Sequence, residues 1–162
     1  MKKEYDFSNG ERGKFYNPDA EFNLPMLKES EVIEAVCIFL ENKGWSIKSR
    51  CSETEKGDDI IAVNHERNLV AIIEAKGATS SKENTARYGK PFSLNQIKNH
   101  VANAFFRVAR NIGDNHISGM ALPKTQKHIS CVKEIEAALH KLQLEVFWVS
   151  SDGSVKTEGF WS

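Results

Sequence analysis

Two neighbouring apolar segments carry, at their ends, side chains that can bind a cation or act on a phosphate. Asp59 directly precedes one segment, residues 60–63, and Glu74 and Lys76 close the other, which begins at Leu69. Both segments are rich in Val, Ile and Ala and are joined by a short polar stretch, which predicts a β-hairpin. Because side chains alternate along a strand, Glu74 and Lys76 should point to the same face.

The predicted register of this hairpin places the two acids opposite each other. If residues 65–68 form a four-residue loop, Asn64 faces Leu69 and Asp59 faces Glu74. Like charges directly opposed across strands are destabilising, so the pair is best explained by a cation between them. Carboxylate oxygens suit Mg²⁺, with Mn²⁺ as the alternative ion. The competing interpretation is a hairpin whose ends are simply charged and solvated.

The order of Asp59 and then Glu74-Ala75-Lys76 resembles the core signature of the PD-(D/E)XK, or restriction-endonuclease-like, nuclease superfamily. The proline of that signature is absent, and Gly57 stands in its region. The resemblance implies an α/β fold with a central mixed β-sheet flanked by helices, in the order α-β-β-β-α-β and here followed by α-β. It also implies a metal held by Asp59, Glu74 and the Ala75 carbonyl, with Lys76 stabilising charge on the phosphate.

The same resemblance implies a third acid on the first helix. Glu31 and Glu34 are both candidates, since residues three apart lie on nearly one face of a helix, and the sequence does not separate them. Either could instead be an ordinary solvated glutamate. The second helix carries a polar stripe: Gln96, His100, Asn103 and Arg107. Gln96 resembles a glutamine found in several subgroups of the family. Gln96 could hold a phosphate, a base edge or a ligand water, and His100 is either a further contact or a structural histidine.

Apolar periodicity and helix-end signals predict the elements that position these residues. The first helix should open at a Ser30 cap, and the second should open at a Ser93 cap and end at Gly113. A continuous apolar run at residues 144–149 favours a strand covered on both faces. The remaining predicted elements are a strand at 45–52, the hairpin, a strand at 117–122 that Pro123 stops, a third helix over 129–142, and a turn at 151–153 that leads into a short tail.

Charge is unevenly distributed along a chain whose 22 basic and 22 acidic residues cancel. Residues 76–110 hold seven basic residues and one acid, Glu83. A polyanion that approached the acidic pair would therefore meet positive charge just downstream of it. An ordinary solvated loop and helix face is the alternative. The nucleic-acid contacts predicted from this segment are Lys82, Arg87, Lys90, Lys98 and His100.

Length and composition predict one nuclease-like domain, residues 28–162, preceded by an arm at residues 1–27. The arm is rich in Gly, polar and aromatic residues, and it could dock on a partner protein or a second copy, contact nucleic acid, or be flexible. It resembles leader segments of some small bacterial proteins, including antitoxin-like ones, so a toxin–antitoxin component is a third class. The three cysteines lack paired spacing, and no apolar stretch approaches the roughly 18 residues of a membrane span. We therefore expect a cytoplasmic protein with no membrane partner.

Together these features predict a magnesium-dependent nuclease, with endonuclease activity, that hydrolyses phosphodiester bonds of nucleic acid. DNA is favoured over RNA as the substrate, although no motif that reads a 2′-hydroxyl is visible to separate them. The alternative is a non-catalytic nucleic-acid-binding or assembly module with a nuclease-like fold.

Overall fold

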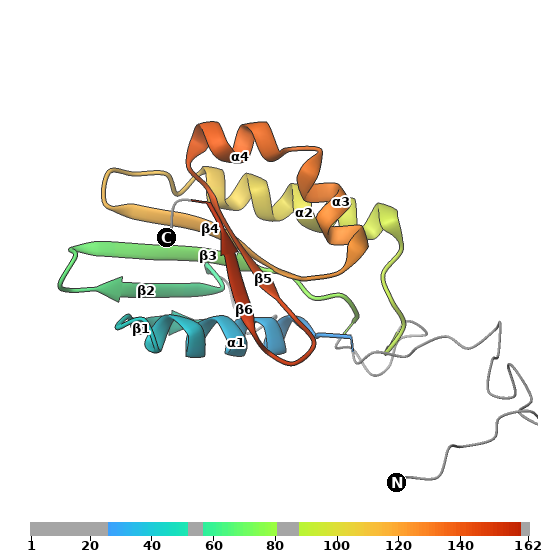
Figure 1. The fold of residues 1–162 in the computed structure, drawn as a ribbon, viewed down its shortest axis with the longest axis horizontal. Helices are drawn as coiled ribbons and strands as arrows, with labels where there is room; N and C mark the ends of the chain where they lie inside the picture. The colour runs from blue at the N-terminus through green and yellow to red at the C-terminus, as the bar shows by residue number, and fades with distance from the viewer. Residues whose placement is uncertain (1–25, 52–56, 81–87, 160–162) are drawn as a thin grey trace, which may run out of the picture.

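The computed structural model describes residues 26–51, 57–80 and 88–159, which form an α/β protein (Figure 1). A six-stranded mixed sheet packs against four helices. The elements are α1 (Glu29–Glu41), β1 (Ser46–Arg50), β2 (Ile60–Asn64), β3 (Leu69–Ala75), α2 (Leu94–Ala109), β4 (His116–Pro123), α3 (Gln126–Lys133), α4 (Glu136–Leu142), β5 (Glu145–Val149) and β6 (Val155–Glu158).

The order of the strands in the sheet is the order of the strands in the chain. Strands β1, β2 and β3 pair antiparallel, β3, β4 and β5 pair parallel, and β6 returns antiparallel to β5. The carboxyl ends of the three parallel strands β3, β4 and β5 therefore lie at the same end of the sheet. In open α/β sheets, ligands usually bind beyond these carboxyl ends.

The predicted hairpin register is confirmed. Asn64 pairs with Leu69 and Val63 with Val70, so the ladder runs directly toward Asp59 and Glu74. The Asn64 side chain accepts a hydrogen bond of 2.9 Å from the backbone N–H of residue 67, which closes the turn. This turn also uses Asn68 in the left-handed region, at φ 51°, a conformation that asparagine tolerates better than most residues.

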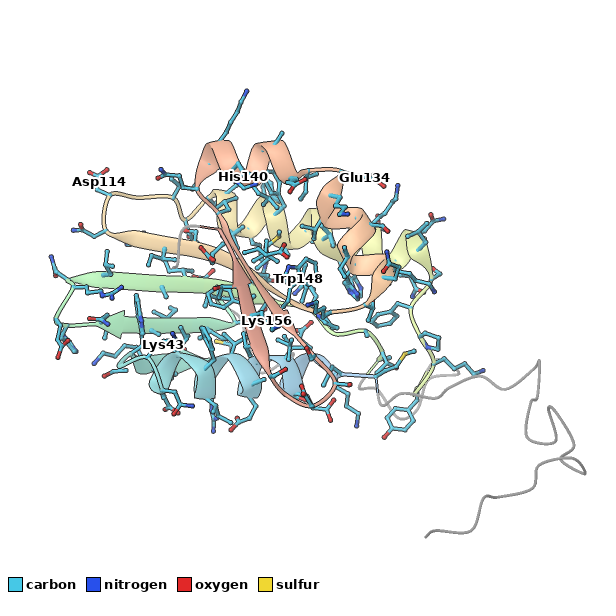
Figure 2. The ribbon with its side chains drawn as sticks, viewed as in Figure 1. Lys43, Asp114, Glu134, His140, Trp148 and Lys156 are labelled. Carbon is cyan, nitrogen blue, oxygen red and sulfur yellow. The ribbon has the colours of Figure 1, made fainter. Side chains whose placement is uncertain are left out.

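The helices cover the two faces of the sheet unequally (Figure 1). Helix α1 alone covers one face, and α2, α3 and α4 cover the other. The α1 core joins Val32, Val36 and Leu40 to strand residues that include Ile73 and Phe147. On the opposite face, Trp148 points into the layer of helices (Figure 2). All five residues of β5 are buried, as expected for a strand covered on both faces.

Four predicted element boundaries were wrong. Helix α2 ends at Ala109, with Arg110 as its C-cap, and not at Gly113. The third helix is two helices, because Ile135 leaves the helical region at φ −116° and ψ 7°. The predicted tail contains β6, in which only Val155 and Thr157 are half-buried, a signal too short to stand out in the sequence. Helix α1 begins at Glu29 with Lys28 as its N-cap, so Ser30 is already helical.

All three cysteines lie within the described residues and are free thiols. In the part of the chain that the structure describes, no helix is long and apolar enough to cross a membrane. Almost all of the predicted N-terminal arm, residues 1–25, lies outside the described residues.

Candidate metal centre

Asp59, which directly precedes β2, and Glu74, on β3, lie side by side on the face of the sheet that α2 covers. Their neighbours Ile60 and Ile73 belong to the α1 core, so the alternation of side chains directs the two acids to the opposite face. Both carboxylates are buried, with relative exposures of 9% and 4%. The backbone N–H of Ala75 donates to Oδ2 of Asp59 at 2.7 Å, which fixes this acid against the neighbouring strand. The predicted acidic pair is therefore brought together.

The side chain of Lys76 lies among these carboxylates. Its Nζ atom is 2.6 Å from Oε1 of Glu74 and 2.6 Å from the Ala75 carbonyl oxygen, and it donates to both. Oδ2 of Asp59 is 3.7 Å away. The ammonium group is thus bonded to two of the oxygen atoms that the sequence predicts as metal ligands.

The electrostatics of the site follow from its burial. Burial raises the pKa of the Asp59 carboxyl group, and the opposing effects of the Lys76 ammonium and the Ala75 N–H do not cancel the increase. For Lys76, burial alone would lower the pKa, but the carboxylates of Glu29, Glu74 and Asp59 outweigh burial and raise it. Lys76 is therefore protonated at neutral pH and supplies a full positive charge to the cluster.

A third carboxylate comes from Glu29, which the sequence analysis missed. Its Oε2 lies 3.6 Å from Nζ of Lys76, and its side chain is 19% exposed. The sequence does contain a signal for it, because Glu29 extends the buried α1 stripe of Ile33, Val36 and Leu40 backwards at helical spacing. Placing the helix start at Ser30 hid that relation.

The two glutamates predicted for this role have other partners. The carboxylate of Glu31 accepts a hydrogen bond of 2.6 Å from the backbone N–H of Lys28 and so caps its own helix. Glu34 is exposed and pairs with Arg50 at 2.8 Å. The structure therefore does not bring either glutamate to Asp59 and Glu74, and the helix carboxylate at the cluster is that of Glu29.

Gly77 allows Glu29 to approach the end of β3. A Cβ atom at this position would lie 2.6 Å from the backbone nitrogen of Glu29 and 3.0 Å from the carbonyl carbon of Lys28. The next residue, Ala78, donates its backbone N–H to the carbonyl of Leu27 at 2.8 Å. The start of α1 and the segment after β3 are thus in backbone contact, and a side chain at residue 77 would separate them.

Helix α2 holds the acidic segment from the other side. Nη1 of Arg107 donates to Oε2 of Glu74 and to the Gly57 carbonyl, both at 3.1 Å. One turn later, the Asn111 amide donates to Oδ1 of Asp58 at 3.2 Å. Arg107 was placed on a polar stripe by its spacing from His100, but its contact with Glu74 depends on tertiary packing. With Lys76 on Oε1 and Arg107 on Oε2, both carboxylate oxygens of Glu74 have cationic partners.

Gln96 and His100, the two residues of this stripe that were predicted to take part in the site, do not reach the carboxylates. Gln96 forms a capping box with Ser93, whose backbone N–H donates to Oε1 of Gln96 at 3.0 Å. His100 packs edge-to-face on Phe92 with ring centroids 4.7 Å apart. Burial lowers the pKa of His100, and the positive charge of Lys76 lowers it further. His100 is therefore a neutral, half-buried neighbour of the cluster at neutral pH.

The predicted basic contacts are dispersed. Lys98 pairs with Glu134 at 3.0 Å, in the layer of helices where Figure 2 labels that glutamate. Lys90 is exposed, and its backbone carbonyl accepts a hydrogen bond from the Thr79 hydroxyl. Lys82 and Arg87 lie outside the described residues.

The donor set fits a hard divalent cation in its chemistry. Asp59, Glu74 and the Ala75 carbonyl offer only oxygen atoms, and the Lys76 ammonium already shows that a cation is stable beside them. As the side chains stand, no group of three or more His, Cys, Asp or Glu residues in the described ranges is arranged to hold a metal ion. A metal ion at these oxygens would therefore require the Lys76 side chain to move away.

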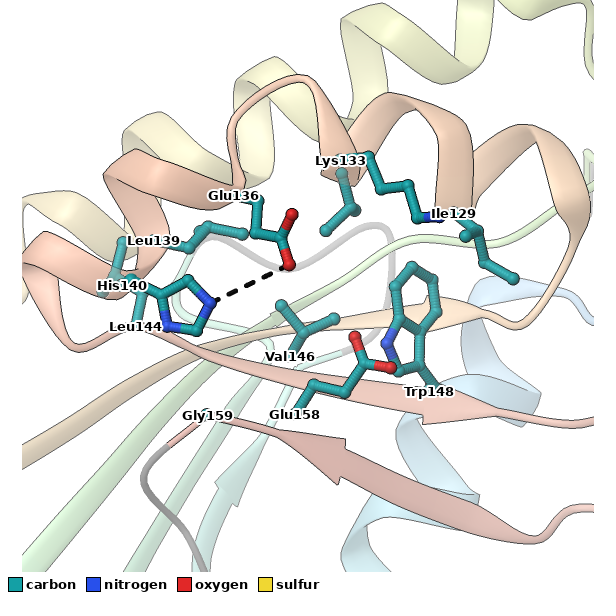
Figure 3. Close-up of a pocket in the computed structure, with 11 residues that line it drawn as sticks. Ile129, Lys133, Glu136, Leu139, His140, Leu144, Val146, Trp148, Glu158 and Gly159 are labelled. Carbon is teal, nitrogen blue, oxygen red and sulfur yellow. Dashed lines mark ion pairs between the residues drawn. The ribbon is translucent and has the colours of Figure 1, made fainter.

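A separate cavity of about 360 Å³ lies between α3, α4 and the strands β5 and β6 (Figure 3). Val146 and Trp148 form part of its apolar lining, and His140 and Glu136 approach each other at its rim at 3.9 Å. None of the residues of the acidic cluster lines this cavity.

Comparison with known proteins gives no match: the chain matches no protein-family model, no curated protein and no solved structure. What the protein does has therefore to be argued from the site itself.

Proposed function

We propose that this protein is a metal-dependent nuclease of the PD-(D/E)XK type. One observation carries the proposal: a lysine ammonium lies 2.6 Å from both a strand carboxylate, Glu74, and the following carbonyl, while a second buried acid, Asp59, directly precedes the paired strand. The order of elements from α1 to β4 supports the same assignment. So does the position of the cluster at the carboxyl end of a parallel strand.

Each side chain of the cluster has a role in this mechanism. Asp59, Glu74 and the Ala75 carbonyl would hold Mg²⁺ or Mn²⁺, and Glu29 would complete the shell directly or through a water molecule. A bound ion would lower the pKa of a ligand water and offset charge on the phosphate. Lys76 would leave Oε1 of Glu74 and place its ammonium beside the developing negative charge, where it stabilises the transition state. Arg107 would keep the Glu74 carboxylate in its orientation through Oε2.

A second function is favoured by the same geometry. Lys76 and Arg107 donate to both oxygens of Glu74, so side chains of the protein itself compensate the charge of this carboxylate. A protein that only binds nucleic acid, or that assembles with a catalytic subunit, could use these residues as a structural core. We propose this non-catalytic module as the alternative.

The deciding experiment compares wild type with the double variant Asp59→Asn, Glu74→Gln. Both proteins are incubated with single- and double-stranded DNA and RNA in Mg²⁺, Mn²⁺ or EDTA, and products are resolved by length. An enzyme should cut in metal, and the double variant should lose cutting while keeping or improving metal-free binding, because two charges that repel phosphate are removed. DNA is the expected substrate.

A matched control removes two acids elsewhere. Glu66→Gln with Asp114→Asn makes the same change of charge at exposed positions away from the cluster, and this variant should cut as wild type does. If cutting survives the change at Asp59 and Glu74, the site is wrongly assigned. If wild type cuts no substrate with either metal, the binding module is the better account.

A further inference from the structure

The outer face of α2 carries an unusual set of side chains. Five exposed residues at spacings of three and four share this face: Asn95, Asn99, Asn103, Phe106 and Arg110. Phe106 is 65% exposed, the largest exposure among the large apolar side chains of the described residues. The guanidinium of Arg110 lies over its ring, 6.0 Å from the centroid. We refer to these five residues as the α2 outer face.

The charge of this region has one sign. No Asp or Glu occurs from Asn84 to Gly113, so α2 and the segments that flank it within these bounds carry only basic and neutral residues. Lys98 is paired with Glu134 and Arg107 with Glu74, but Arg110 contacts only the Phe106 ring among the described side chains. An approaching phosphate would therefore meet an arginine that has no carboxylate partner there.

The amide side chains are poorly explained by helix stability. Asparagine is a weaker helix former than Lys, Glu or Gln, and three of them follow one exposed stripe of α2. An amide both donates and accepts hydrogen bonds, which suits base edges and sugar-phosphate groups. An exposed aromatic ring adds a surface on which a base of any sequence can stack.

The α2 outer face is also coupled to the acidic cluster. Arg107, adjacent to Phe106 in the same helix, donates to Glu74 and to the Gly57 carbonyl. A nucleic-acid strand that lay along α2 would thus contact the same helix that orients Glu74. Residues 95–110 span about 22 Å, which corresponds to about six stacked nucleotides.

We infer that the α2 outer face binds an unpaired stretch of the nucleic-acid substrate, with one base stacked on Phe106 and a neighbouring phosphate on Arg110. The inference rests on the proposed function and narrows its substrate to nucleic acid with a single-stranded segment. A base inside an intact duplex is stacked on both sides and cannot lie flat on Phe106, so duplex DNA should bind this face more weakly.

The test is an equilibrium binding measurement in EDTA, in which no metal-dependent cleavage occurs. Fluorescence anisotropy with a labelled 12-nucleotide single strand is recorded for wild type, Phe106→Ala, Phe106→Leu and Arg110→Gln. Phe106→Ala should raise the Kd roughly 5- to 140-fold, which corresponds to about 1–3 kcal/mol per stacked base. Phe106→Leu keeps an apolar side chain without the aromatic face, and its affinity for the single strand should fall nearly as much. Arg110→Gln should reduce the dependence of log Kd on log salt concentration by about 0.7.

Ile38→Ala serves as the control, because Ile38 is 49% exposed on α1, which covers the opposite face of the sheet. It should bind as wild type does, and thermal unfolding should show all variants folded. A blunt duplex of the same length should bind wild type more weakly than the single strand does. The substitution Phe106→Ala should reduce the affinity for this duplex less than it reduces the affinity for the single strand.

The outcomes separate this inference from the nuclease assignment. Unchanged single-strand affinity in folded Phe106→Ala overturns the inference, whether or not the protein cuts. Loss of self-association in that variant, with nucleic-acid binding intact, also overturns it and identifies the face as a contact between copies. If Phe106→Ala loses affinity as described but the wild-type protein cuts no substrate with any metal, the binding role of the α2 outer face is supported and the nuclease assignment is rejected.

Discussion

Nζ of Lys76 and Oε1 of Glu74 are 2.6 Å apart, so the ammonium occupies a lone pair of that oxygen and would repel a divalent ion that bound to it. The side chain of this lysine is therefore both a neighbour of the proposed ligands and a competitor for them. Its ammonium offsets the repulsion between the two buried acids, Asp59 and Glu74, and the partly buried Glu29. The position of the ammonium also predicts opposite effects of one substitution on metal binding and on catalysis.

We expect Lys76→Ala to bind Mn²⁺ about 10- to 100-fold more tightly than wild type, because the ion no longer displaces a charge-assisted hydrogen bond of about 1.5–3 kcal/mol. Cleavage should nevertheless fall by roughly 10²-fold or more, since the ammonium no longer stabilises the transition state. Titration calorimetry and a cleavage assay on the same preparation check both halves. Weaker Mn²⁺ binding in the variant would show that Lys76 organises the ligands and does not compete with the ion.

Glu29 should behave differently from the two glutamates beside it. Glu29→Gln removes a carboxylate whose oxygen lies 3.6 Å from the Lys76 ammonium, and we expect Mn²⁺ affinity to fall by about tenfold, or about 1.4 kcal/mol. Glu31→Gln and Glu34→Gln are matched controls, because their carboxylates contact Lys28 and Arg50, and both should leave Mn²⁺ affinity within about twofold of wild type. Equal losses in all three variants would mean that the effect is long-range charge and not a local ligand.

The substitution Gly77→Ala should disturb the cluster without changing any of its charges. The added methyl group would meet backbone atoms of residues 28 and 29, which cannot rotate away as a side chain can. Overpacking of this kind costs about 1–3 kcal/mol of unfolding free energy, which denaturant titration measures. Mn²⁺ binding should weaken with it, because α1 and Glu29 must move outward. Gly89→Ala is the contrasting variant: φ there is +69° and nothing lies within 4 Å, so it carries backbone strain but should leave Mn²⁺ binding unchanged.

The unfolding free energy should decrease in acid because of His128. This side chain is fully buried, and burial, helped by the positive charge of His100 and Lys127, lowers its pKa from 6.5 to about 4. The unfolded chain therefore binds this proton below about pH 6.5, and the folded chain binds it only below about pH 4. The contribution of His128 to the unfolding free energy is therefore complete above about pH 6.5. It is lost as the pH falls from about 6.5 to about 4, by up to about 3 kcal/mol.

Urea unfolding of wild type and His128→Gln between pH 7 and pH 4 measures that contribution by difference, which cancels the groups common to both proteins. The gap between the two unfolding free energies should narrow as the pH falls. A gap that stays constant would show that His128 titrates alike in the folded and unfolded chain.

Local sequence signals predicted the hairpin and its register because two short-range rules agree there. Alternation fixed the faces, and a loop of four residues fixed which residue pairs with Leu69. The same reasoning identified Ser93 as the cap of α2, where its hydroxyl accepts from the N–H of Gln96. These features depend on residues only a few positions apart.

The parts of the site that sequence reasoning missed depend on contacts between distant segments. Arg107 reaches Glu74 across 33 positions, and its role follows from how α2 packs over β3. Glu29 was missed because the N-cap was placed two residues too late, at Ser30, since Lys28 is not a usual N-cap residue. The division between α3 and α4 carries no Gly or Pro at Ile135, so composition gave no sign of it.

The sequential strand order has a consequence for how the protein acquires its site. Each strand pairs with the strand made just before it, so the sheet can grow by successive additions, although the parallel pairs β3–β4 and β4–β5 close only after the helices that connect them have been made. Helix α1 is made before the strands and packs against all six of them, from β1 to β6. Part of the surface that covers the helix carrying Glu29 is therefore missing until β4, β5 and β6 have emerged. A growing chain can hold Asp59 and Glu74 on a finished hairpin well before the third carboxylate is in place, and the cluster is complete only when folding is.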